Sequence, residues 1–321
     1  GLANAVGMAI AEEIFRKKFS STIINNKTYV IASDGDLMEG ISHEAMSLAG
    51  HLKLKNLIVF FDNNKISIDG STSLSVSDNY KKRFESYGWS FQEINGHNEK
   101  QITKAISKAS KSNKPTIISC KTIIGYGSPN KSGKASSHGS PLGDDEISLV
   151  RKKLKWNNKP FEIPKDILDE WRKIGNKGKH LENKWHETIN KKNTKLKNEL
   201  QETIEKFDIA KLEHLIQQEK KKYFESKPSL ATRQCSMAVI EKISTFLPQL
   251  IGGSADLSGS NNTKTNNSKI INSKNFNGNY IHYGVREHGM AAIMNGLALY
   301  GGIIPFGGTF LIFSDYCKPS I

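Results

Sequence analysis

Three residues with metal-binding and phosphate-binding chemistry follow two apolar segments. Asp34 and Gly35 follow residues 28–32 with Ser33 between them, and Asn64 follows residues 56–61. Ligands of open parallel sheets bind beyond the carboxyl ends of the strands. A carboxylate, an amide oxygen and nearby carbonyls suit a hard cation that holds phosphate oxygens, and glycine lets a phosphate approach the backbone. The spacing alone leaves two ordinary strand-ending turns as the alternative.

The pattern around these residues predicts strands that alternate with helices. A turn is expected at Ser33-Asp34-Gly35, and Ser42 is expected to cap the next helix, whose N-terminal dipole would attract phosphate. Strand, helix and fully apolar strand in this order are typical of a parallel sheet. In the first half, strands are predicted at residues 28–32, 56–61 and 116–120, and helices at residues 2–15, 43–46 and 99–111.

A second α/β pattern begins at Ser229, after a Gly-rich and Ser-rich loop at residues 125–143 and a charged helical stretch at residues 149–224. We therefore expect one α/β domain at residues 1–195, with a helical extension from about residue 149, and a second at residues 196–321. In the second half, the predicted elements are a helix at 231–245, strands at 250–251 and 280–282, a helix at 287–300 and a glycine-rich segment at 301–308.

Composition narrows the functional class. The chain has 321 residues, 37% of them hydrophobic, and no apolar run near the roughly 20 residues of a membrane span. Its formal net charge of +14 comes mostly from scattered lysine, which we interpret as solvated surface, so neither nucleic acid nor membrane is expected as a partner. Cys120, Cys235 and Cys317 form no CxxC pair, which argues against zinc and disulfides and suits a reducing cytoplasm. The chain starts at Gly1, and we expect a fragment at both ends.

Short segments that occur in order along the chain are more specific. Residues 33–42 (SDGDLMEGIS) with Asn63-Asn64 resemble the GDG…NN motif of thiamine-diphosphate enzymes. Six segments resemble the transketolase family: MEGISHEA at 38–45, ISIDG at 66–70, KTIIGYGSPNK at 121–131, SHGSPLG at 137–143, GGSADL at 252–257 and HYGVREHGM at 282–290. One such motif would be weak, whereas six in order identify the family.

The resemblance implies a divalent cation, magnesium or else calcium or manganese, between the cofactor and the protein. Asp34, Asn64 and the backbone carbonyl of Ile66 would bind it, and Gly35 would contact the diphosphate. Ile68 would lie beneath the cofactor and hold its two rings in a bent conformation. Without the resemblance, Ile68 would be interpreted as a core residue of a strand.

Glu287 is the catalytic residue that the resemblance implies. The matching glutamate hydrogen-bonds the pyrimidine ring and favours its imino tautomer, which deprotonates the thiazolium carbon, and the resulting carbanion attacks the ketose. Glu39 resembles the glutamate that meets Glu287 across a dimer interface. From the residues alone, Arg286-Glu287 is a surface ion pair at a helix start, and Glu39 favours the N-terminal end of a nearby helix.

Aromatic and acidic residues of the second half match further cofactor contacts. Phe310, Phe313 and Tyr316 match aromatics that pack on the pyrimidine, although a helical core stripe has the same spacing. Asp256 matches an acidic residue near the thiazolium, or is a turn residue.

The remaining matches concern the substrate. Arg233 and Ser260 match positions that bind the substrate phosphate, for which a guanidinium group is well suited. His138 and Lys121 match positions that line the channel of substrate and cofactor, with His138 also a catalytic candidate. Each of these residues, seen alone, is an ordinary solvated side chain.

Two residues depart from the family pattern. Ser33 stands where the motif usually has glycine, which weakens the diphosphate turn, and Ala135 stands where many members have a histidine. The upstream histidines, the remainder of the pyrimidine domain and the C-terminal domain of the family have no counterpart in this sequence.

The sequence thus predicts an α/β protein with two thiamine-diphosphate-binding-type domains, the second truncated, whose parallel sheets are flanked by helices. The implied enzyme is a cytoplasmic homodimeric transketolase of the pentose phosphate pathway or a Calvin-type pathway. It would reversibly transfer a two-carbon ketol unit from xylulose 5-phosphate to ribose 5-phosphate, which gives sedoheptulose 7-phosphate and glyceraldehyde 3-phosphate. The alternatives are dihydroxyacetone synthase, deoxyxylulose-phosphate synthase and an inactive transketolase-like subunit.

Overall fold

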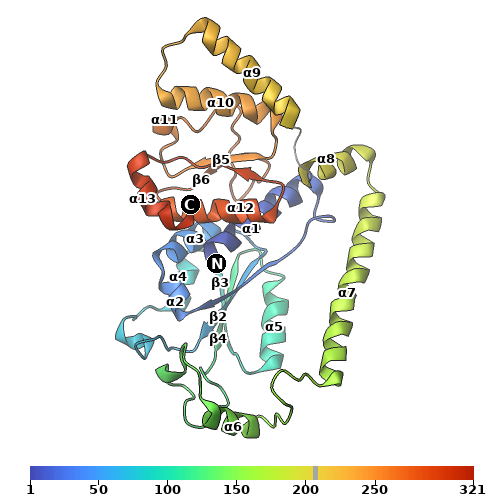
Figure 1. The fold of residues 1–321 in the computed structure, drawn as a ribbon, viewed down its shortest axis with the longest axis vertical. Helices are drawn as coiled ribbons and strands as arrows, with labels where there is room; N and C mark the ends of the chain where they lie inside the picture. The colour runs from blue at the N-terminus through green and yellow to red at the C-terminus, as the bar shows by residue number, and fades with distance from the viewer. Residues whose placement is uncertain (205–208) are drawn as a thin grey trace.

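The computed structural model describes residues 1–204 and 209–321, which form two α/β units (Figure 1). The predicted fold class, parallel sheets flanked by helices, is confirmed in both units. In Figure 1 the second unit stacks on the first, and helices α1 and α12 lie between the two sheets. None of the described helices combines the length and the apolarity that crossing a membrane requires.

The first unit is built on a parallel four-stranded sheet of order β1-β2-β4-β3. The strands are β1 (Thr28–Ser33), β2 (Leu57–Asn63), β3 (Ser90–Asn95) and β4 (Thr116–Lys121). The two central strands, β2 and β4, carry the buried apolar runs that the sequence predicted, whereas the edge strand β3 is half-exposed and was not predicted. Burial on both faces explains why the central strands are apolar without alternation.

Helices cover both faces of this sheet. Leu57 and Val59 of β2 face the larger core with α1 and α3, and Ile58 packs with Ala105 and Ala109 of α5 on the other face. The helices of this unit are α1 (Leu2–Phe19), α2 (Asp34–Met38), α3 (Gly40–His51), α4 (Tyr80–Ser86) and α5 (Glu99–Ala109).

Two local predictions after β1 were wrong. The expected turn at Ser33-Asp34-Gly35 is instead the start of helix α2, because Asp36 accepts hydrogen bonds from the Ser33 backbone N–H (2.7 Å) and hydroxyl (2.9 Å) and fixes a helical turn. Ser42 does not cap the following helix, since α3 already begins at Gly40. The buried Ser42 hydroxyl donates to the Asp36 carbonyl at 2.5 Å and ties α2 to α3.

A helical segment connects the two sheets, as the sequence predicted, although residues 205–208 of the predicted stretch lie outside the described residues. Trp185 of α7 donates its indole N–H to the Ile23 carbonyl at 2.9 Å and attaches this segment to the first unit. The helices are α6 (Asp144–Lys153), α7 (Lys165–Asn190), α8 (Thr194–Ile204) and α9 (Ile209–Ser226).

The second unit has a parallel three-stranded sheet of order β6-β5-β7. Strand 280–282 and helix 287–300 were predicted at their observed bounds, whereas β7 inside the glycine-rich segment was not predicted. The strands are β5 (Leu250–Ser254), β6 (Tyr280–His282) and β7 (Ile304–Pro305), and the helices are α10 (Thr232–Phe246), α11 (Ser258–Asn261), α12 (Glu287–Tyr300) and α13 (Ser314–Cys317).

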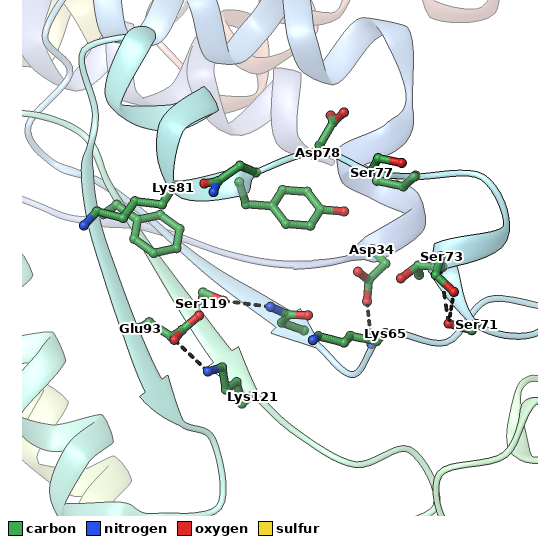
Figure 2. Close-up of a pocket in the computed structure, with 16 residues that line it drawn as sticks. Asp34, Lys65, Ser71, Ser73, Ser77, Asp78, Lys81, Glu93, Ser119 and Lys121 are labelled. Carbon is green, nitrogen blue, oxygen red and sulfur yellow. Dashed lines mark hydrogen bonds and ion pairs between the residues drawn. The ribbon is translucent and has the colours of Figure 1, made fainter.

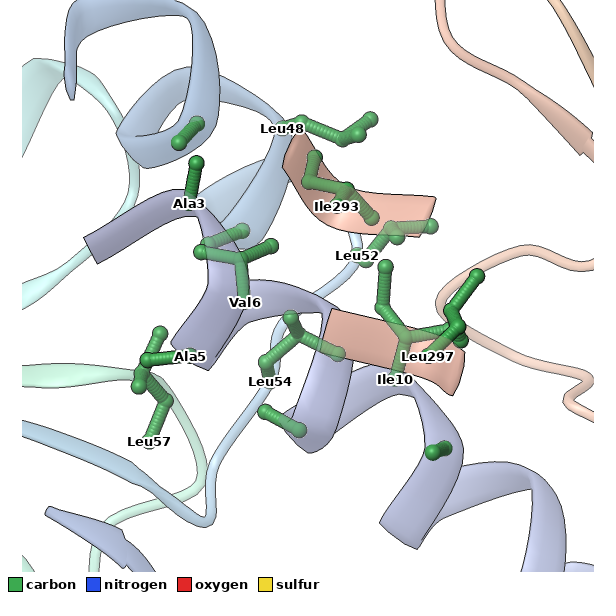
Figure 3. Packing of buried hydrophobic residues seen from close by; sticks show 14 of the residues in the cluster. Ala3, Ala5, Val6, Ile10, Leu48, Leu52, Leu54, Leu57, Ile293 and Leu297 are labelled. Atoms are coloured by element: carbon green, nitrogen blue, oxygen red, sulfur yellow. The ribbon is translucent and has the colours of Figure 1, made fainter. Parts of the chain in front are cut away.

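Glycines let the two units pack closely. A Cβ added to Gly7 of α1 would lie 2.1 Å from the Ile293 carbonyl oxygen, and one added to Gly296 of α12 would lie 1.9 Å from the Asn4 carbonyl oxygen. Figure 3 shows the apolar side chains around this crossing, among them fully buried Ile293. One hydrophobic core therefore extends across both units.

Candidate functional site

A cavity of about 770 Å³ opens at the carboxyl ends of the strands of the first sheet (Figure 2). The predicted residues Asp34 and Lys121 line it. Asn63 of the GDG…NN motif also lines it. Residues that sequence reasoning missed line it as well, and they include Lys65, Ser71, Ser73, Tyr80, Glu93 and Ser119. All of these residues come from the first unit.

Asp34 is the most unusual group in this cavity because its carboxylate is buried with one oxygen unsatisfied. Its side chain is 2% exposed, and Oδ2 accepts a hydrogen bond from the Lys65 backbone N–H at 3.1 Å. Oδ1 is buried without a hydrogen-bond partner in the described part of the chain. Burial raises the pKa of the Asp34 carboxyl above its ordinary value, and the Lys65 hydrogen bond offsets this only in part. A bound cation would satisfy the free oxygen.

Asn64 and Ile66 lie in the turn that follows β2. The Asn64 carbonyl oxygen Oδ1 accepts from the Ile66 backbone N–H at 2.9 Å, and Lys65 between them adopts a left-handed backbone with φ of 60°. Since Asp34 bonds the same turn, the predicted carboxylate, amide and carbonyl oxygens belong to one neighbourhood. Within residues 1–204 and 209–321, no three His, Cys, Asp or Glu side chains gather as a metal site. A cation would thus rely on amide and carbonyl oxygens as well as Asp34, an oxygen set that fits magnesium.

The surroundings also fit a diphosphate. A Cβ added at Gly35 would meet nothing within 4 Å, so the backbone there is open to a bulky group. The Tyr80 hydroxyl is buried and has no partner of good hydrogen-bond geometry among the described residues. Burial, followed by the charge of Asp34, raises the pKa of Tyr80. Tyr80 and Asp34 thus interact with each other on one cavity, but neither the hydroxyl nor Oδ1 has a hydrogen bond of good geometry among the described residues. A metal-bound phosphate group would supply such partners.

Lys121 ends β4 and lines the cavity, whereas His138 lies in the loop beyond it. The Lys121 ammonium lies 2.7 Å from the Glu93 carboxylate at the strand ends. His138 is exposed on its loop and does not line the cavity. Glu146 fixes the base of this loop by accepting hydrogen bonds from the Ser128 hydroxyl and from the backbone and side chain of Asn130. These hydrogen bonds lower the pKa of Glu146 to about 2.

Ile68 and Glu39 both lie on the surface of the first unit. The Ile68 side chain is 75% exposed, so its interpretation as a strand core residue was wrong. An exposed apolar side chain in the turn beside the cavity agrees with a cofactor contact. Glu39 is exposed at the N-terminal end of α3, where a carboxylate is favourable in any case.

A second group of predicted residues lies at the carboxyl edge of the second sheet. Asp256 follows β5, Glu287 follows β6 and Phe310 follows β7. Glu287 is 8% exposed as the first residue of α12, and the Thr309 hydroxyl lies 3.5 Å from its Oε1. The predicted alternative of an Arg286–Glu287 ion pair was wrong, because Arg286 donates instead to the Tyr283 carbonyl (2.7 Å) and the Ser47 hydroxyl (3.1 Å).

Glu44 connects the two groups through helix α3, a link that the sequence gave no means to see. Its Oε2 accepts the backbone N–H of Gly289 in the first turn of α12 at 2.6 Å. The residues are 245 positions apart. This carboxylate from the first unit therefore caps the helix on which Glu287 stands.

The three predicted aromatics form a row of rings near the end of the chain. Ring centroids of Phe310 and Phe313 are 5.8 Å apart, and those of Phe313 and Tyr316 are 6.0 Å apart. Phe310 is 42% exposed and Tyr316 is 65% exposed, so the interpretation as a core stripe was wrong for these two residues. Their free faces are available to an aromatic ligand.

The predicted substrate residues are also exposed. Arg233 lies in the first turn of α10 and Ser260 lies in α11. Asp256 is exposed and has a left-handed backbone with φ of 60°. Of the predicted residues, Asp34 and Lys121 line the cavity of the first sheet, whereas Asp256, Glu287 and Phe310 follow the strands of the second sheet.

Comparisons with known proteins cover nearly the whole sequence. Residues 1–210 match the family described as "Transketolase, thiamine diphosphate binding domain", and residues 228–321 match "Transketolase, pyrimidine binding domain". Curated transketolases of Sinorhizobium medicae and Buchnera aphidicola are 45% and 48% identical to the chain over 99% and 100% of its length, and the alignments cover 46% and 49% of those proteins.

Solved structures give the same result. A transketolase of Campylobacter jejuni aligns with a TM-score of 0.90 and 37% identity, over 100% of this chain and 48% of that one. A transketolase of Pichia stipitis in complex with sedoheptulose 7-phosphate aligns with a TM-score of 0.88 and 35% identity, over 100% of this chain and 49% of that one. The chain spans about half the length of the curated relatives it matches.

Proposed function

This chain belongs to the transketolase family, and from that premise we propose that it is part of an enzyme that reversibly transfers a two-carbon ketol unit between sugar phosphates. Donors of the xylulose 5-phosphate and sedoheptulose 7-phosphate type would pass the unit to ribose 5-phosphate or glyceraldehyde 3-phosphate. Such an enzyme would serve the pentose phosphate pathway in the cytoplasm. Residues 1–195 would bind the diphosphate of the cofactor, and residues 196–321 would bind its pyrimidine.

The observation that carries this proposal is the buried Asp34 carboxylate with its unpartnered Oδ1. Burying an ionised group without a partner is costly, and a divalent cation removes that cost. Asp34, Asn64 and the Ile66 carbonyl would hold the cation, with magnesium the best match to an all-oxygen set. Open space at Gly35 would admit the diphosphate.

When bound, thiamine diphosphate supplies the electron sink for cleaving the bond beside the ketose carbonyl. The chain's own residues bind, orient and move protons. Glu287 would hold and return a proton where the pyrimidine ring binds, because it is nearly buried at the sheet edge and contacts Thr309, the residue before exposed Phe310. Phe310, Phe313 and Tyr316 form the row of rings against which the pyrimidine would pack. Ile68 would support the bent cofactor from below.

Two subunits would build each site. The Asp34 cavity is lined by residues of the first unit alone, and Glu287 lies at a different sheet edge of the same chain. A homodimer in which Glu287 of the partner subunit completes the cavity would unite the two groups. Glu39, exposed before α3, would then meet that glutamate at the interface.

The substrate would be bound by exposed polar groups. The guanidinium of Arg233 and the hydroxyl of Ser260 would hold the sugar phosphate, since a guanidinium matches phosphate oxygens in geometry and charge. Asp256 would lie near the thiazolium, and Lys121 and His138 would line the channel. The positive net charge of +14 favours anionic sugar phosphates over neutral sugars.

Product analysis of the full-length protein tests this function. Xylulose 5-phosphate and ribose 5-phosphate are supplied with thiamine diphosphate and magnesium, and formation of sedoheptulose 7-phosphate is followed. Transfer that requires both cofactors is expected. A preference for formaldehyde as acceptor would indicate dihydroxyacetone synthase, and absence of any transfer by folded, cofactor-saturated protein would contradict the proposal.

A further inference from the structure

A second cavity, of about 400 Å³, lies at the opposite edge of the first sheet from Asp34. Lys53 and Lys55 reach it from the turn before β2, and Asn113 reaches it from the turn before β4. These positions are at the amino ends of the strands. This cavity is therefore distinct from the one proposed to hold the cofactor, and we name it the amino-edge cavity.

The amino-edge cavity is strongly cationic. Its lining contains the side chains of five basic residues and one carboxylate, which leaves a formal charge of +4. The carboxylate is Glu13 and the basic residues are Arg16, Lys17, Lys53, Lys55 and Lys274.

The single carboxylate pairs with the arginine, so the charge of +4 that remains belongs to the four lysines. Glu13 bonds Arg16, whose Nε also lies 3.3 Å from Glu12. The ammonium groups of the four lysines have no carboxylate partner in the chain as described, 1–204 and 209–321. Four unpaired cations around one cavity repel one another unless an anion joins them.

The other lining groups are suited to phosphate oxygens. Ser21, Asn113 and Ser273 can donate neutral hydrogen bonds beside the charged ones, and buried Phe276 adds an apolar wall. Charge-assisted hydrogen bonds to phosphate are about twice as strong as neutral ones. The volume falls within the roughly 300–1,000 Å³ of ordinary small-molecule sites.

We propose that the amino-edge cavity binds a small anion with two or more linked phosphate groups, either inorganic or attached to a nucleoside. A single phosphate would leave part of the +4 charge uncompensated. Residues 273–276 belong to the second unit and the other lining residues to the first, so the anion bridges the two units. Binding therefore stabilises their association beside the α1–α12 crossing.

Calorimetric titration of the full-length protein with inorganic pyrophosphate tests the proposal. The protein carries Asp34→Ala, and the buffer contains a chelator at fixed ionic strength. The cavity lined by Asp34, here named the carboxyl-edge cavity, is thereby disabled as a metal–diphosphate site. One saturable site per chain is expected. The substitutions Lys53→Gln, Lys55→Gln and Lys274→Gln together should weaken it at least about tenfold, the change that 1.4 kcal/mol produces.

A matched control removes three lysines from an exposed helix face. Lys100→Gln, Lys104→Gln and Lys108→Gln lie on α5 and leave the amino-edge cavity intact, and this variant should bind pyrophosphate as the parent does. A parallel titration with adenosine diphosphate identifies the source of the phosphates, since tighter binding than pyrophosphate would assign the site to a nucleotide.

Three results would overturn the proposal: no saturable binding by the parent, equal weakening in both triple variants, or binding that appears only when Asp34 is intact. The last would place the anion in the carboxyl-edge cavity. Thermal unfolding of each variant without ligand checks that it is folded, and the single variant Lys274→Gln replaces the triple one if that fails. Ketol transfer is not measured, so the outcome is independent of the proposed function.

Discussion

Replacing Asp34 with asparagine should stabilise the apoprotein while abolishing metal-dependent cofactor binding. The carboxylate is 2% exposed, accepts one backbone hydrogen bond through Oδ2 and has Oδ1 unpartnered within the described residues. Asparagine keeps the acceptor for the Lys65 N–H and removes the buried charge. It also removes the only carboxylate of the proposed cation site.

The expected gain is modest. Leaving a buried polar group unsatisfied costs about 1–3 kcal/mol. We expect a gain of about 1 kcal/mol at neutral pH, at the low end of that range, because the amide NH₂ takes the place of Oδ1 and keeps part of the cost.

The stability gained by Asp34→Asn should be largest at neutral pH and should shrink as the pH falls. Burial raises the pKa of Asp34 in the folded protein above its ordinary value of 3.8, so the folded state binds the proton more tightly than the unfolded state. Wild type is therefore penalised at neutral pH, where the carboxylate is ionised. The penalty shrinks as pH falls through the raised folded pKa and disappears below the unfolded value. The advantage of Asp34→Asn should follow the same course.

Two measurements on full-length protein check this. Denaturant unfolding of metal-free protein at several pH values gives the stability difference, and calorimetric titration of thiamine diphosphate with and without magnesium gives the binding. Glu213→Gln, at an exposed carboxylate beyond the first turn of α9, is the control and should change neither. Metal-dependent affinity that survives in Asp34→Asn, or a variant less stable than wild type at pH 7, would refute the reasoning.

Three further substitutions probe the interface of the units, the substrate and the capped helix. Gly7→Ala adds a Cβ 2.1 Å from the Ile293 carbonyl oxygen and should destabilise the protein by about 1–3 kcal/mol. Denaturant unfolding measures this loss, and an unchanged unfolding midpoint would contradict the close crossing of α1 and α12. Arg233→Ala should raise KM for phosphorylated donors roughly ten- to hundred-fold, from about 1.5–3 kcal/mol per charged hydrogen bond. Hydroxypyruvate should be spared, and equal losses would make Arg233 structural. Glu44→Gln removes the charge that caps α12 at Gly289 and should cost about 0.3–2 kcal/mol of stability, lowering kcat more than it raises KM; a change in KM alone would disprove the positioning role.

The sequence predicted elements well where burial alone decides them. Residues 280–282 and 287–300 were placed at their observed bounds because Tyr280 and Ile281 and most of the small-residue helix are buried. Edge strand β3 was missed since its half-exposed residues form no apolar run. The start of α2 was missed because Asp36 reaches back to Ser33, a contact that outweighs the turn preference of Asp-Gly.

The site was predictable only through residues near strand ends and family motifs. Asp34 was found in this way, but nothing in the sequence shows that its Oδ1 lacks a partner. Tyr80 and Glu44 were missed because their roles arise from tertiary contacts. Tyr80 interacts with the buried Asp34, and Glu44 bonds Gly289 of α12, 245 positions further along the chain. The roles of Glu287 and the exposed aromatics remain predictions from the family resemblance.

The central claim is that Glu287 is the proton partner of cofactor-dependent ketol transfer, and the exchange rate of the thiazolium C2 proton tests it most directly. Glu287→Gln keeps the size and hydrogen-bonding capacity of the side chain but removes its proton chemistry. General acid–base contributions are typically about 10²–10⁴-fold. We therefore expect both kcat and the rate of C2 proton exchange on the bound cofactor to fall by about that range. Quenched-flow NMR measures the exchange rate. Cofactor affinity should change far less, because its metal and diphosphate contacts lie at Asp34, Asn64 and Gly35. Exchange as fast in Glu287→Gln as in wild type would contradict the claim.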